Sequence, residues 1–224
     1  MKFILSFCSA FFVTTALFSQ NQFGIFAGPQ VTTAKYSVLN VNQKTNNKYG
    51  FQAGVTMKVP FESNLYFAPE AFYSLKGYKV AFTTFAYPPD ATATDNNTTI
   101  HTFELAALLQ VDLGSKPSHF YIKAGPSLDF QLIGKETFNL NTGGSVSRNM
   151  KWGPAEYGHF SANLLTRFGY ETKSGFMIFA QHTLGPASIN NADFGPRIRH
   201  RAYGLSIGKY INRKKILIDT RNKE

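Results

Sequence analysis

Apolar and polar residues alternate with a period of two along most of this chain, most clearly in residues 49–59, 102–113 and 120–132. Successive side chains of a β-strand point to opposite faces of the sheet, so this period predicts strands with one apolar and one polar face. Weaker copies of the pattern lie in residues 22–32, 64–76, 158–170, 175–184 and 200–211. The sequence therefore predicts an all-β fold built from these eight segments.

The connections between these segments alternate between short and long. Residues 60–63, 114–118 and 171–174 are tight polar turns. The long connections are rich in Asn, Thr, Gly and Pro and cover residues 33–48, 77–99, 133–157 and 185–199. Outer-membrane barrels have short periplasmic turns and longer external loops. We therefore expect residues 21–212 to form an eight-stranded antiparallel up-and-down transmembrane β-barrel, located in the cell outer membrane.

The composition fits a sheet that meets apolar surroundings on one face. Charged residues make up 16% of the 224 residues, below the quarter that is usual for soluble domains, and aromatic residues make up 15%. The formal net charge is +10, but the basic residues are scattered rather than gathered into the stripe that a nucleic-acid module needs. We therefore expect no nucleic-acid partner.

Residues 1–20 have the pattern of a secretory signal peptide. Lys2 supplies a positive charge, Phe3 to Phe18 are mostly apolar, and Ser19-Gln20 offers a cleavage point. The alternative is a buried N-terminal strand or helix. The only cysteine, Cys8, lies in this leader, so the mature chain has no thiol for catalysis, metal binding or a disulfide. Residues 213–224 are interpreted as a basic periplasmic tail.

The polar faces of the predicted strands carry four basic and four acidic residues. They are Lys58, Lys76, Lys123, Arg167, Glu70, Glu104, Asp112 and Asp129. An eight-stranded barrel is just wide enough for side chains to fill, and buried charges persist only when they are paired. The balance predicts an interior plugged by ion pairs. The alternative is a soluble periplasmic barrel whose apolar face surrounds a ligand, because a period of two does not say which face points inward.

Three prolines interrupt otherwise regular strands, namely Pro29, Pro69 and Pro126. Proline cannot donate to the ladder of hydrogen bonds and is usually found at a sheet edge or a bulge. We therefore expect a β-bulge at each of these positions.

Short motifs spread over the chain resemble the PorT-like outer-membrane β-barrel family. They are Phe18-Ser19-Gln20, Phe23-Gly24-Ile25-Phe26-Ala27-Gly28, Thr102-Phe103-Glu104-Leu105-Ala106-Ala107-Leu108-Leu109, Tyr121-Ile122-Lys123-Ala124-Gly125-Pro126 and Tyr203-Gly204-Leu205-Ser206-Ile207-Gly208. The resemblance implies an eight-stranded barrel in the outer membrane, and it implies no catalytic residues. Ala106-Ala107 replaces the family's more usual proline-containing stretch, and a charged tail follows Asn212. One member is associated with type IX secretion, and this specific role does not follow for this chain.

Few residues suggest chemistry. His159-Phe160-Ser161, with Glu171 further on, is similar to the His-x-Ser arrangement of lipid A deacylases, although both residues fall on the inward, polar register. The histidines at 101, 119, 182 and 200 show no ligand spacing, so we expect no metal. The glycines at 143 and 144 lack the context of a phosphate loop, and Asn97-Thr98-Thr99 matches a frequent glycosylation pattern. We expect no catalytic residues and no cofactor.

The function we expect is that of a non-enzymatic outer-membrane barrel with a plugged, non-porin interior, acting structurally or through its extracellular loops, with a link to secretion as one option. Outer-membrane lipid and lipopolysaccharide are the expected partners, and a periplasmic or cell-surface protein is a further candidate. One hypothesis is that Arg197, Arg199, His200 and Arg201 contact lipopolysaccharide phosphates, for which arginine is suited. The alternative is ordinary solvated charge. A periplasmic ligand-binding barrel and a lipid A-modifying enzyme are the other functions considered.

Overall fold

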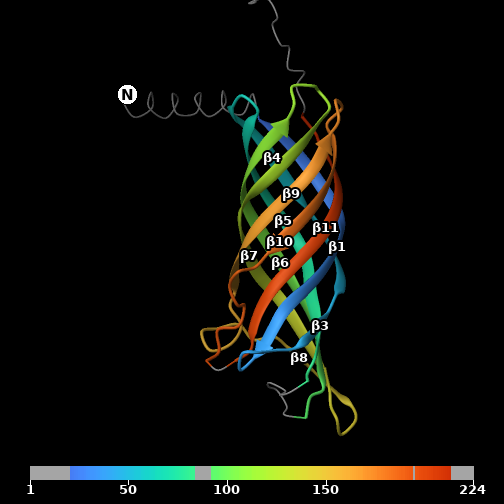
Figure 1. The fold of residues 1–224 in the computed structure, drawn as a ribbon, viewed down its shortest axis with the longest axis vertical. Coiled ribbons are helices and arrows are strands. Elements are labelled where there is room, and N and C mark those ends of the chain that lie inside the picture. The colour runs from blue at the N-terminus through green and yellow to red at the C-terminus, as the bar shows by residue number, and fades with distance from the viewer. Residues whose placement is uncertain (1–20, 84–91, 194, 213–224) are drawn as a thin grey trace, which may run out of the picture.

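The computed structural model describes residues 21–83, 92–193 and 195–212, and their strands belong to one antiparallel sheet of eleven strands. Eight long strands form the wall of a tall, narrow barrel whose strands are tilted to its axis (Figure 1). They are β1 (Gln22–Val38), β4 (Lys48–Glu62), β5 (Leu65–Ala81), β6 (Asp95–Leu113), β7 (His119–Asn139), β9 (Phe160–Glu171), β10 (Phe176–Leu184) and β11 (Arg197–Tyr210). The predicted leader and basic tail lie outside the described residues.

The barrel closes because the last strand pairs with the first. β11 runs antiparallel to β1, from the pair Gly24–Tyr210 to the pair Ser37–Arg197. The backbone N–H of Ile211 donates to the Phe23 carbonyl at 2.6 Å, which extends the closure to the ends of both strands. A closed sheet leaves no long unpaired edge. The predicted eight-stranded up-and-down barrel is confirmed.

Three short strands lie in the long connections: β2 (Val41–Asn42), β3 (Lys44–Asn46) and β8 (Ser145–Asn149). The short turns and long connections alternate as predicted, but the wall strands have 9 to 21 residues instead of about ten. At the long-loop end, β1 continues to Val38 and β7 to Asn139. Sequence periodicity missed these extensions because the pattern inverts there: the outward side chains, such as Lys35 and Ser37, become polar, and the inward ones, such as Tyr36 and Val38, become apolar.

The prediction of a bulge at each proline was wrong. The register on both sides of Pro29 is unchanged, and only the β1–β11 ladder is interrupted there. Pro69 likewise interrupts the ladder to β4 and Pro126 the ladder to β6, again with no added residue. A residue of an antiparallel strand exchanges backbone hydrogen bonds with only one of its two neighbouring strands. A proline, which has no N–H, therefore interrupts the ladder on one side only. Register shifts occur instead between Pro60 and Glu62 and at His101–Thr102.

Glycine precedes two of these prolines because neighbouring backbone lies very close. A Cβ atom on Gly28 would lie 2.0 Å from the Leu205 carbonyl oxygen, and one on Gly125 would lie 2.2 Å from the Ala107 carbonyl oxygen. Both distances are far below van der Waals contact, so only glycine fits at these two places in the wall. None of the described residues belongs to a helix long and apolar enough to cross a membrane.

Candidate functional site in the barrel interior and at its rim

The polar face of the wall points inward and the apolar face points outward. All eight charged residues predicted on the polar face are buried. Outward residues such as Leu109 and Ile207 have 52% and 68% of their surface exposed. An apolar outer face around a charged interior is the arrangement of a membrane barrel. The alternative of a soluble barrel with an apolar cavity is therefore wrong.

Aromatic side chains lie near both ends of the apolar outer face. A row of them crosses four neighbouring strands on the long-loop side, and its members are Tyr73, Phe103, Phe130 and Phe160. Near the short turns, the Phe120 ring stacks on Phe168, with ring centroids 5.6 Å apart. Aromatic girdles of this kind flank the apolar band of membrane barrels at the two interfaces.

The first interior charge cluster lies near the short turns. The ammonium of Lys58 on β4 is 2.6 Å from Asp112 Oδ2 on β6 and 3.0 Å from Glu171 Oε2 on β9. His119 Nε2 lies 3.0 Å from the same Asp112 oxygen. Since β4 and β9 are not neighbours in the sheet, the lysine spans the lumen.

Asp112, His119 and Glu171 also form the one group among the described residues with metal-ligand spacing, each offering an atom within 4.8 Å of the others. The ammonium of Lys58 already forms an ion pair with both carboxylates, so a metal would have to displace it. Sequence reasoning missed the group because it treated the histidines separately. His119 has the inward parity of Lys123, and Glu171 that of Arg167, so extending the alternation by a few residues would have placed both inside.

The second cluster lies further into the barrel, around Glu70 on β5. Arg167 Nη1 is 2.5 Å from Glu70 Oε2, and Lys123 Nζ is 3.0 Å from Glu70 Oε1. The Arg167 guanidinium also lies 4.5 Å from the Phe26 ring and 4.4 Å from the Phe179 ring. Two cations from β7 and β9 thus share one carboxylate, and aromatic faces supply the remaining stabilisation.

The third cluster centres on Lys76. Its ammonium lies 2.8 Å from Glu104 Oε2 and 2.7 Å from Asp129 Oδ2, and Ser127 Oγ donates to the other Glu104 oxygen. All of these side chains are buried. Together the three clusters pair every cation predicted to lie inside the barrel.

An apolar cap closes the interior at the long-loop end. Its buried members include Tyr36, Tyr78, Ile100, Tyr157, Ile189 and Ile198. Glu136 is buried beside it, accepts a hydrogen bond from Tyr157 Oη at 2.6 Å, and pairs with Arg148 Nε at 2.9 Å. Burial, together with the nearby Glu136 charge, raises the pKa of the Tyr157 phenol, which therefore stays neutral and donates the hydrogen bond.

The residues considered for catalysis are not brought together. Ser161 is buried inside the barrel, whereas His159 lies exposed just before β9, against the ring of Trp152. Both had been predicted on the inward register, which is wrong for His159. Glu171 lies at the opposite end of β9, paired with Lys58. The remaining histidines are dispersed: His101 contacts Tyr73, and His182 stacks on Tyr203.

The basic residues at the start of β11 divide between the two faces. Arg197, Arg199 and Arg201 point outward, but His200 is buried against the Tyr78 ring, so the prediction that it shares their surface is wrong. Asn97 is exposed on β6 and accepts a hydrogen bond from Lys48, whereas Thr98 is buried. Gly143 and Gly144 have φ angles of 89° and 87° and form the turn between β7 and β8.

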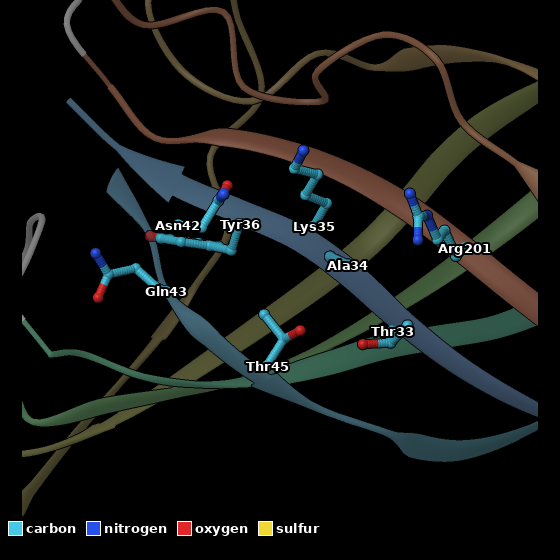
Figure 2. Close-up of a pocket in the computed structure, with 8 residues that line it drawn as sticks. All are labelled: Thr33, Ala34, Lys35, Tyr36, Asn42, Gln43, Thr45 and Arg201. Atoms are coloured by element: carbon cyan, nitrogen blue, oxygen red, sulfur yellow. The ribbon is translucent and has the colours of Figure 1, made fainter. Parts of the chain in front are cut away.

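Two adjoining hollows lie on the wall beside these arginines, and we call them together the rim groove. The first, of about 170 Å³, is bordered by Lys35, Asn42 and Arg201, and Figure 2 shows Lys35 between the other two. The second, of about 200 Å³, is bordered by Lys35, Asn42, Arg197 and Arg199. The lining of both hollows contains no acidic residue among those the structure describes.

The family model described as an outer membrane protein beta-barrel domain matches residues 18–191. No curated protein matches the chain. Similar solved structures include Ail of Yersinia pestis, with 12% identity, 84% of this chain and 97% of that chain covered, and a TM-score of 0.43. Neisserial surface protein A has 12% identity, 83% and 96% coverage and a TM-score of 0.40.

OprG of Pseudomonas aeruginosa is also similar, with 11% identity, 86% and 97% coverage and a TM-score of 0.36. The family match spans the strands from β1 to β10, including those that carry all three charge clusters. It agrees with the outward apolar face and the closed antiparallel sheet. The chain therefore belongs to the outer membrane protein beta-barrel domain family and is located in the outer membrane.

Proposed function

We propose that this protein is a non-enzymatic outer-membrane barrel with a plugged interior, which acts structurally or through its extracellular loops. The observation that carries the proposal is the pairing of interior charges across the lumen. Arg167 on β9 reaches Glu70 on β5, and Lys58 on β4 reaches Glu171 on β9. Ion pairs that join opposite walls occupy the space that a porin leaves to water.

The separation of His159 from Ser161 supports the non-enzymatic part of the proposal. A nucleophile needs its base within hydrogen-bond reach. Ser161 faces the barrel interior, whereas His159 is exposed and lies just before the first residue of β9. A lipid substrate would also have to pass through the wall to meet Ser161. The loops and the outer surface are therefore where this protein meets other molecules.

Conductance measurement tests the plug. Purified protein, refolded and inserted into planar bilayers, is expected to give no steady ion current, and vesicles that contain it should not take up small sugars. A gel that compares unboiled with boiled samples establishes that the inserted protein is folded, because a folded barrel migrates anomalously until it is boiled. A stable current from the heat-modifiable wild-type protein would overturn the plugged interior.

The same proposal includes membership of the PorT-like subgroup, a link to secretion and a protein partner. Cross-linking in intact outer membranes, followed by purification of the barrel, tests for a periplasmic or cell-surface protein partner. The test variant has a shortened β7–β8 hairpin, from which residues 142–147 are removed, and the wild-type protein is its control. Loss of a specific cross-linked protein from this variant would support a partner bound through the loops, whereas identical patterns would count against that role for the hairpin.

A further inference from the structure

The rim groove lies on a small three-stranded patch of the outer wall. β1 has β11 on one side and the short strand β2 on the other, and the pairs Ser37–Arg197 and Ser37–Asn42 meet in this patch. Alternation places Lys35 and Ser37 on the outer face of β1, and Arg197, Arg199 and Arg201 on the outer face of β11. Four cations therefore share one surface.

The arrangement of these cations is unfavourable without a counter-ion. Lys35 lies directly opposite Arg199 in the ladder, and like charges in opposite positions of a sheet repel each other. Among the described residues, no carboxylate forms an ion pair with any of the four. By contrast, the interior cations are all matched with acids. The groove is built to receive negative charge from outside the chain.

Its position indicates where that charge comes from. Immediately after Arg201, the outward residues of β11 are Tyr203, Leu205 and Ile207, which are 54%, 61% and 68% exposed. On β1 the outward residues toward the short turns are likewise apolar, ending at Phe23. The cations thus begin where the apolar face ends, with Tyr203 at the border, which is the level of lipid head groups.

We propose that the rim groove binds the phosphate groups of a phosphorylated glycolipid head group in the outer leaflet. Lys35 and Asn42 border both hollows, Arg201 borders one, and Arg197 and Arg199 border the other. Two adjoining hollows of this kind hold two phosphates, with Lys35 between them. Arginine binds phosphate oxygens through a planar fork, while the lysine acts as a compact point charge. This inference rests on the proposed function, because it requires the barrel to be inserted in the membrane.

The test measures stability in vesicles of defined composition. Full-length protein is refolded into phosphatidylcholine vesicles alone, with bisphosphorylated lipid A, or with lipid A from which the phosphates have been removed. Inorganic phosphate added to plain vesicles forms a fourth arm. We expect bisphosphorylated lipid A to raise the urea concentration at half-unfolding, and the dephosphorylated lipid and the free ion to leave it unchanged. Salt should weaken the effect, since exposed charges are screened.

The double variant Lys35→Gln with Arg199→Gln is expected to lose the lipid A shift. The matched control is Lys209→Gln, which removes an outward cation of the same strand β11 near the short turns, where it contacts the Phe176 ring. This control should keep the shift. Retention of the shift by the double variant overturns the groove, and an equal shift with inorganic phosphate overturns its assignment to lipid. Loss of heat-modifiable migration by the wild-type protein would instead overturn the proposed function.

Discussion

Arg167 on β9 and Glu70 on β5 meet inside the barrel, with Arg167 Nη1 2.5 Å from Glu70 Oε2. Both side chains are buried, at 1% and 0% exposure, so neither charge is solvated by bulk water. Lys123 contacts the other Glu70 oxygen at 3.0 Å. Two buried cations therefore share one carboxylate, and the cost of removing each partner should differ.

Glu70→Gln should destabilise the barrel more than Arg167→Met. The first change leaves Arg167 and Lys123 without their acid, whereas the second leaves Glu70 paired with Lys123. Removing one partner of a buried ion pair costs about 3–5 kcal/mol, so we expect Glu70→Gln to reach at least that range. Urea unfolding in vesicles measures the difference. Glu62→Gln, at an exposed strand end, is the control, and equal stability of all three variants would contradict the interior pairing.

A charge on the outer face should cost stability according to its depth. Leu109 lies in the middle of the outward apolar run of β6, which begins at Phe103, and Leu113 is the last residue of that strand at the short-turn end. Arginine costs about 2–4 kcal/mol at the middle of a bilayer and about 0–1 kcal/mol near its surface. Leu109→Arg should therefore lower the free energy of unfolding in vesicles much more than Leu113→Arg. Equal costs at the two positions would argue against lipid around the barrel.

Gly28→Ala should prevent closure of the barrel. The new methyl group would lie 2.0 Å from the Leu205 carbonyl oxygen and 2.5 Å from Ser206 Cα, so β1 and β11 could not keep their present spacing. We expect most of the variant to lack heat-modifiable migration after refolding. Gly153→Ala, where no atom lies within 4 Å of the added carbon, serves as the comparison and should refold like the wild type.

The loop-side cap should loosen at alkaline pH. The pKa of Tyr157 is raised in the folded state, so its stabilising contribution is complete below the unfolded value of about 10 and declines as the pH rises above it. The single tryptophan, Trp152, packs against the Tyr157 ring with centroids 6.2 Å apart, and its fluorescence reports on the cap.

Tyr157→Phe provides the comparison for this alkaline transition. The variant loses the hydrogen bond to Glu136, so its cap should be less stable at neutral pH, and it cannot ionise at position 157. We therefore expect a flatter Trp152 emission profile between neutral and strongly alkaline pH than in the wild type. The same alkaline transition in both proteins would assign it to another group.

The alternation of side chains along each strand predicted the barrel and most of its interior. The alternation around Phe103 and Glu104 placed outward and inward side chains correctly, and all eight charges assigned to the inside are buried. This succeeds because the period of a strand is a local property of the backbone. Loop length supplied the orientation that parity alone does not.

Contacts across the lumen could not be predicted in this way. Which residue of β4 meets which residue of β9 depends on the stagger of all intervening strands, so the pairing of Lys58 with Glu171 is absent from any local pattern. The same holds for Lys35 beside Arg199, which come from opposite ends of the barrel sequence and meet only on closure. His200 was misplaced for a simpler reason, since its parity opposes that of its arginine neighbours.

The unequal lengths of the wall strands give the barrel a tall side and a low side. At a rise of ~3.3 Å per residue and a tilt of ~40°, the 19 residues of β6 climb roughly 48 Å along the axis, against roughly 23 Å for the 9 residues of β10. An apolar band is about 25 Å high. The β6–β7 side therefore extends further beyond the apolar band than the β10 side does, so a large molecule that approaches the long-loop end would meet this side first.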